Sequence, residues 1–177
     1  MNLPQLSKKG MIAGLSLVIL LQTGILAMVY ISARIPMWTG SPVLLETSPV
    51  DPRSLFRGNY ARLNYDISRI PAQEINRLGK PRPNERVYVR LTPGPDQVHV
   101  YKGVSFTRPE SGLFIRGRIQ ERSWRSAGSY RIRYGIEAYF APKEKALALE
   151  KQLRTSAVAK IYISDSGKPA LEGIYDR

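Results

Sequence analysis

The sequence predicts a mainly β protein, with an antiparallel sheet or partly closed barrel and one or two helices, joined to one N-terminal transmembrane helix. Two observations lead to this prediction. Residues 11–33 form an apolar run without a single charge. Most of the chain after that run alternates apolar and polar residues with a period of two, which is typical of half-buried strands.

The apolar run is long enough to cross a bilayer. It is flanked by Lys8 and Lys9 on one side and by Arg34 on the other. At about 1.5 Å per residue it forms a helix of roughly 35 Å, and a hydrocarbon core is about 30 Å thick. A cleaved signal peptide is the alternative, because the run ends in the small residue Ala33. Cleavable apolar segments are usually only about 7 to 15 residues long, so we expect a retained anchor.

The charges beside the run predict its orientation. Two lysines precede it and a single arginine follows closely. Cytoplasmic flanks carry the excess of Lys and Arg, so the C-terminal part is expected outside the cytoplasm. We therefore expect a single-pass signal-anchor protein of the inner (cytoplasmic) membrane with a periplasmic domain. Its predicted parts are a cytoplasmic tail (1–10), a transmembrane anchor (11–33), a linker (34–42) and a β-rich extracytoplasmic domain (43–177).

The composition of the chain excludes cysteine chemistry and favours anionic partners. The chain of 177 residues has no cysteine, which excludes disulfides, thiolate metal sites and cysteine nucleophiles. After the anchor and its flanking cations come 24 of the 27 Lys and Arg residues and all 14 acids, a formal charge of +10. This excess favours an anionic envelope component, acidic lipids or an acidic protein partner. An outward location argues against nucleic acid, and the oligomeric state is not predicted.

The alternating pattern predicts eight strands and leaves two helical stretches. One helix is expected over 68–78, with Ser68 as its cap and Gly79 after its end. The other is expected over the alanine- and leucine-rich residues 143–154. The strands are expected around 43–47, 63–67, 87–91, 98–106, 113–119, 130–140, 157–163 and 171–175.

The segment over residues 50–65 carries a family resemblance. Four of its residues match a spaced motif: Gly58, Tyr60, Leu63 and Tyr65. On this basis the domain, over residues 43–175, resembles the bacterial GDYXXLXY family of membrane proteins. Asn59 stands where the family usually has aspartate, which argues against a role that needs a carboxylate there. The family has no characterised function, so the resemblance implies a class of protein and no mechanism.

Two interpretations of this segment remain open. In the structural one, Gly58 and Asn59 form a turn that leads into a core strand, and the tyrosine hydroxyls find polar partners. In the functional one, a surface loop presents its side chains to a partner or ligand. The residues of this motif loop are Asp51, Arg53, Arg57, Gly58, Asn59, Tyr60, Leu63 and Tyr65.

Arginines gather on one predicted face. Period-two spacing places Arg116 and Arg118 on the polar side of one strand, and Arg131 and Arg133 on the polar side of the next. If the two strands pair as a hairpin, the four guanidinium groups share one face. Like charges directly opposite each other are unfavourable, so such a face is expected to meet an anion or an acidic partner. The alternative is a solvated arginine-rich surface with nearby acids.

No enzyme motif is present, and we expect no catalytic residue, cofactor or metal. His99 is the only histidine and cannot form a multi-histidine metal site. The expected function is a binding or accessory module of the cell envelope. The alternative is a membrane-tethered hydrolase in which a lysine of lowered pKa activates a serine. Its candidate residues are Ser54, Ser105 or Ser111, with Lys102 or Lys160.

Overall fold

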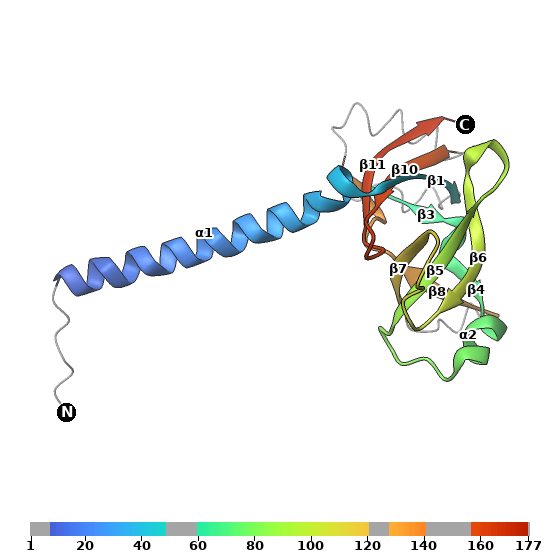
Figure 1. The fold of residues 1–177 in the computed structure, drawn as a ribbon, viewed down its shortest axis with the longest axis horizontal. Coiled ribbons are helices and arrows are strands. Elements are labelled where there is room, and N and C mark those ends of the chain that lie inside the picture. Colours follow the sequence, from blue (N-terminus) through green and yellow to red (C-terminus); the bar gives the residue numbers. More distant parts are fainter. Residues whose placement is uncertain (1–7, 49–59, 121–127, 141–156, 177) are drawn as a thin grey trace. The chain divides into compact units, whose positions relative to one another are not determined.

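The computed structural model describes residues 8–48, 60–120, 128–140 and 157–176 of the chain. It confirms a mainly β protein with one long apolar helix near the N-terminus (Figure 1). The chain divides into two compact units, residues 1–35 and 36–177, and each is considered by itself.

The first unit consists mainly of helix α1 (Lys8–Thr39), whose last residues belong to the second unit. The helix is long and apolar enough to cross a membrane, a property that a signal sequence would share. Its large apolar side chains, such as Leu20 and Met28, are exposed. Two hydroxyls, Thr23 Oγ1 and Ser32 Oγ, donate to carbonyls of the preceding turn at 2.9 and 2.8 Å. Because these hydroxyls are satisfied within the helix, they add little to the cost of placing it in lipid.

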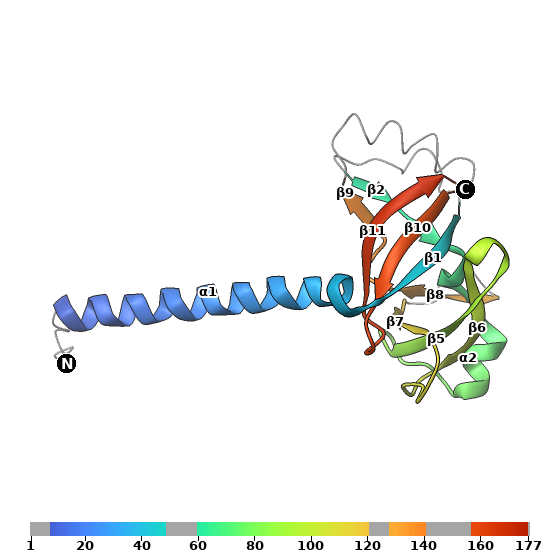
Figure 2. The ribbon, with the colours of Figure 1, turned by 45° about the horizontal axis from the view of Figure 1, so that its top comes forward.

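The described strands of the second unit form three antiparallel sheets (Figure 2). The first has the order β11-β10-β1-β3, the second is β2-β9, and the third has the order β4-β8-β7-β5-β6. The bounds are β1 (Ser41–Ser48), β2 (Tyr60–Arg62), β3 (Asn64–Tyr65), β4 (Arg69–Pro71), β5 (Arg86–Pro93), β6 (His99–Ser105), β7 (Phe114–Ile119), β8 (Ser129–Arg133), β9 (Ala138–Phe140), β10 (Ala157–Ile163) and β11 (Pro169–Asp176).

One hydrophobic core joins the four-stranded and the five-stranded sheet. Leu45 and Ile161 from the first, and Val89 and Ile115 from the third, are fully buried in the same cluster. The period-two pattern of β5 is confirmed, since its two valines and its leucine are buried while both of its arginines are exposed. β5 thus turns one face to the core and leaves the other for polar side chains.

The sheets are connected at their edges, as a partly closed barrel requires. The segment over residues 60–65 pairs with β9 through β2 and with β1 through β3. Between them the amide of Leu63 donates to the carbonyl of Glu137 at 2.8 Å. A single parallel bridge joins Leu44 in β1 to Val98, just before β6.

The helix predicted over 68–78 is only partly correct. Helix α2 covers Ala72–Leu78, with Pro71 at its N-cap and Gly79 at its C-cap. Ser68 instead ends the 3₁₀ turn η2 (Asp66–Ser68) and does not cap α2. The reason is that β4 pairs with β8 and therefore uses the intervening backbone in a sheet. A second 3₁₀ turn, η3 (Pro95–Gln97), lies between β5 and β6.

Two further predictions have different outcomes. The strand predicted over 130–140 is interrupted, because the chain turns through Gly135, at φ 88°, between β8 and β9. The helix predicted over 143–154 lies outside the described residues.

Candidate anion-binding site

A row of three arginines crosses the outer face of the five-stranded sheet. Arg86 in β5 lies directly opposite Arg118 in β7, and Arg118 lies directly opposite Arg133 in β8. Opposed residues of antiparallel strands have their Cα atoms about 4.5 to 5.5 Å apart. We call these three residues the arginine row. Without a counter-ion, this arrangement places like charges where they repel each other.

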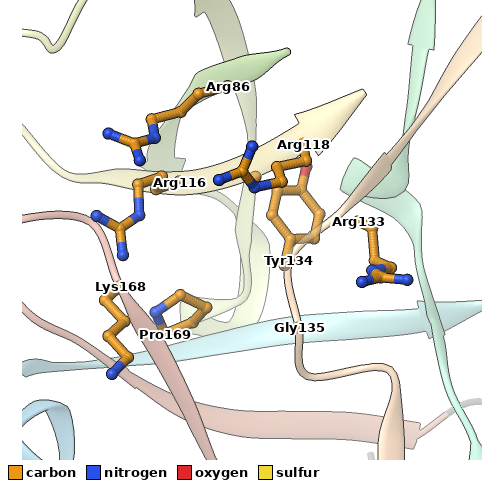
Figure 3. A pocket seen from close by; sticks show the side chains of 9 residues that line it. Arg86, Arg116, Arg118, Arg133, Tyr134, Gly135, Lys168 and Pro169 are labelled. Atoms are coloured by element: carbon orange, nitrogen blue, oxygen red, sulfur yellow. The ribbon is translucent and has the colours of Figure 1, made fainter. Parts of the chain in front are cut away.

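The row borders a cavity of about 310 Å³, which we call the arginine pocket. Arg116, two residues before Arg118 on the same side of β7, also lines it, as does Lys168 from the turn between β10 and β11. In the view of Figure 3, the guanidinium groups of Arg86, Arg116 and Arg118 extend to one side of Tyr134 and that of Arg133 lies on the other. The nine lining residues of this part of the structure include five cations and no acid.

The turn between β10 and β11 supplies Lys168. Within the turn, Gly167 donates to the carbonyl of Ser164 at 2.7 Å, and Ser164 donates to the carbonyl of Lys168 at 3.0 Å. Gly167 has φ 78°, and a Cβ there would lie 2.7 Å from the ring of Phe114. Its carbonyl accepts the amide of Arg116 at 2.7 Å. Glycine thus allows the turn to dock against β7 and brings a fifth cation to the pocket.

Tyr134, the residue directly after β8, lines the pocket and is itself buried. Its buried hydroxyl donates to the carbonyl of Ile67 at 2.6 Å. Burial raises the pKa of this phenol well above its ordinary value, and the nearby Glu137 charge adds to the effect. The two oxygens of Glu137 accept the amides of Tyr134 and Gly135. These bonds fix the chain where β8 leaves the sheet, and so position Arg133.

The structure brings together three of the four predicted face residues. Arg116, Arg118 and Arg133 line the arginine pocket, whereas Arg131 does not. Arg131 lies opposite Arg69 of β4 and lines a neighbouring pocket. Burial lowers the pKa of Arg131, and the charges of Arg69 and then Arg62 lower it further.

Sequence reasoning missed two cations of the pocket. Arg86 lies on the polar side of a strand that the alternation predicts, so its face was predictable but its neighbours were not. Lys168 lies in a turn, where no periodicity assigns a side chain to a face. Only the pairing of β7 with β5 and the docking of the turn reveal that both belong to the site.

The pocket is suited to bind an oxyanion. Guanidinium groups present forked donors that match the oxygens of phosphate and carboxylate, and charge-assisted bonds of this kind are the stronger ones in proteins. One donor is already engaged, since Arg118 Nη1 donates to the carbonyl of Asn84 at 3.0 Å, which orients that side chain. An anion in the pocket would offset the repulsion within the arginine row.

The motif residues within the described structure lie mostly in the core. Leu63 and Tyr65 are buried, and the hydroxyl of Tyr65 donates to the carbonyl of Ile136 at 2.7 Å. Tyr60 belongs to β2. The remaining motif-loop residues, Asp51, Arg53, Arg57, Gly58 and Asn59, lie outside the described residues.

The described residues do not support a serine–lysine hydrolase. Ser105 shares a hydrogen bond with Thr107 rather than with a lysine. The Nζ atom of Lys160 lies 2.9 Å from Oε2 of Glu172. The hydrogen bond between them raises the pKa of Lys160, whereas a general base requires a lowered pKa. Lys102 and Ser111 are exposed. Ser54 lies outside the described residues.

A comparison with known protein families confirms the resemblance that the motif indicates. Neither the curated proteins nor the solved structures give a significant match. The family described as GDYXXLXY protein matches residues 22–174, which is most of the chain and includes the strands that form the pocket. The chain therefore belongs to the GDYXXLXY protein family.

Proposed function

We propose that this protein is a single-pass membrane protein whose extracytoplasmic β domain binds an anionic component of the cell envelope. The arginine row carries the proposal. Three arginines in directly opposed positions, joined by Arg116 and Lys168, form a pocket whose described lining has five positive charges and no negative one. A fold that keeps this unfavourable arrangement is best explained by a ligand that neutralises it.

The membrane location rests on α1. The helix is apolar over a length that spans a bilayer, and the flanking lysines favour a cytoplasmic N-terminus. A reporter that is active only outside the cytoplasm, fused to the C-terminus, should be active in cells. Activity of a cytosol-only reporter at the same position, or a mature chain that begins after Ala33, would contradict the anchor and its orientation.

The binding role is tested by removing charge from the row. In the full chain in neutral detergent, Arg86→Gln with Arg118→Gln should abolish binding of orthophosphate, measured by calorimetry at low salt. The control is Arg77→Gln with Arg82→Gln, which removes the same charge from two exposed arginines that do not line the pocket. Equal losses in both variants would show that only net charge matters, and would refute a defined site.

The salt dependence provides a second measurement. Binding through charge should weaken steeply as monovalent salt is raised, because counter-ions compete for the same groups. The chain in mild detergent can also be used to identify what co-purifies with wild type and not with the Arg86 and Arg118 double variant. An uncharged or basic co-purifying ligand that is retained by the variant would argue against the proposal.

A further inference from the structure

A second, smaller pocket adjoins the arginine pocket on the same sheet. Its volume is about 130 Å³, several times the roughly 30 Å³ that one water occupies in the liquid. Arg62, Ser68 and Arg131 line it, and Arg133 lines both this pocket and the arginine pocket. We call it the Ser68 pocket. The shared arginine makes the two pockets parts of one surface.

The hydroxyl of Ser68 is buried and unpaired among the described residues. The residue as a whole is 6% exposed. Nearly all buried polar atoms in folded proteins are paired, because an unpaired one costs stability. The sequence suggests that Ser68 caps the following helix, but Pro71 occupies that position and Ser68 does not cap it. A ligand oxygen in the pocket would satisfy this hydroxyl.

The charges around the pocket point to an anion. Among its described lining residues, three are arginines and one is an acid, Glu137. Both oxygens of Glu137 already accept backbone amides, those of Tyr134 and Gly135. The opposed pair of Arg69 and Arg131 adds a further positive charge close by. The pocket therefore combines excess positive charge with a hydroxyl donor that lacks an acceptor.

Resting on the proposed function, we infer that the Ser68 pocket binds a second charged group of the same ligand, so that the ligand is a linear polyanion with repeated phosphate groups. Phosphate fits better than carboxylate because it offers more acceptor oxygens to donors that come from several strands. Arg131 and Arg133 lie two residues apart on the same face of β8. The two positions are therefore about 7 Å apart along the strand. A chain of phosphates can place one group in each pocket, whereas orthophosphate fills only one.

Calorimetry with the full chain in neutral detergent tests this inference. Wild type should bind tripolyphosphate and longer polyphosphate at least about tenfold more tightly than orthophosphate at the same salt concentration. Ser68→Ala and, separately, Arg131→Gln should each lower polyphosphate affinity about tenfold and leave orthophosphate affinity unchanged. The control variants Ser111→Ala and Arg77→Gln alter an exposed serine and an exposed arginine, and should behave as wild type.

The outcomes separate the two proposals. If Arg86→Gln with Arg118→Gln abolishes orthophosphate binding while Ser68→Ala and Arg131→Gln leave the ratio of polyphosphate to orthophosphate affinity unchanged, the second subsite is refuted and the binding function stands. If none of the variants changes the binding of any anion, both fail. Ser68→Ala removes a hydroxyl that has no partner among the described residues, so the unfolding temperature should not fall. A lower unfolding temperature would show that the hydroxyl has a structural role and would contradict its role in binding a ligand. Binding to anionic lipid vesicles without binding to polyphosphate would overturn the inference in favour of a membrane surface.

Discussion

Glycine at position 117 decides whether the strands beneath the arginine pocket can pack. It lies in β7 between Arg116 and Arg118, on the side that faces the core. A Cβ at this position would lie 2.4 Å from Cγ2 of Ile132 and 2.9 Å from Cδ1 of Tyr134. Ordinary contacts of this kind are 3.4 Å or longer, so Gly117→Ala forces β8 and its side chains to move by about an ångström.

The cost can be worked out from that overlap. Placing one extra carbon in a well-packed core typically destabilises a protein by about 1–3 kcal/mol. For a domain of this size, about 2 kcal/mol corresponds to a decrease of about 6–10 °C in Tm. The backbone itself is not the cause, since Gly117 does not have a positive φ.

The assay is thermal unfolding of the full chain in neutral detergent, measured by scanning calorimetry. Gly103→Ala is the matched control, because Gly103 lies in β6 of the same sheet and a Cβ there would meet nothing within 4 Å. That control should leave Tm unchanged or raise it slightly, since glycine is unfavourable in a strand. A Gly117→Ala variant with the Tm of wild type would refute the packing argument.

Three further predictions concern the support of the site and its response to pH. Glu137→Gln leaves one oxygen for two backbone amides and should lower the free energy of unfolding by about 1–2 kcal/mol in denaturant titration. Tyr134→Phe leaves the buried carbonyl of Ile67 without its donor and should cost about 1–2 kcal/mol in the same assay, with an unchanged value contradicting the hydrogen bond. Burial lowers the pKa of His99 below its ordinary 6.5, with backbone carbonyls opposing the effect. The unfolded chain then takes up the proton first as pH falls through about 6.5, so stability should decrease below that pH, and His99→Gln should remove this decrease in Tm. Parallel pH profiles for wild type and variant would contradict the assignment, since His99 is the only histidine.

Local patterns in the sequence were enough to predict the long apolar helix, the longer strands and the polar side of a strand. The alternation around β5, β7 and β10 correctly predicts strands, and it places Arg116 and Arg118 outward because side chains alternate across a strand. Hydropathy alone predicts the long apolar helix. The prediction failed at Ser68, because a local capping pattern cannot compete with long-range pairing of the residues that follow it.

Composition and periodicity determine that this chain has an apolar helix, a cationic β domain and arginines on an outer face, because these properties depend only on residues a few positions apart. The tertiary structure decides the rest. Strand register places Arg86 opposite Arg118 and Arg118 opposite Arg133, and a docked turn adds Lys168. Pairing of residues far apart in the chain also brings Ser68 and Arg62 to Arg131. No local pattern encodes such neighbours, because register is set by how the whole core packs.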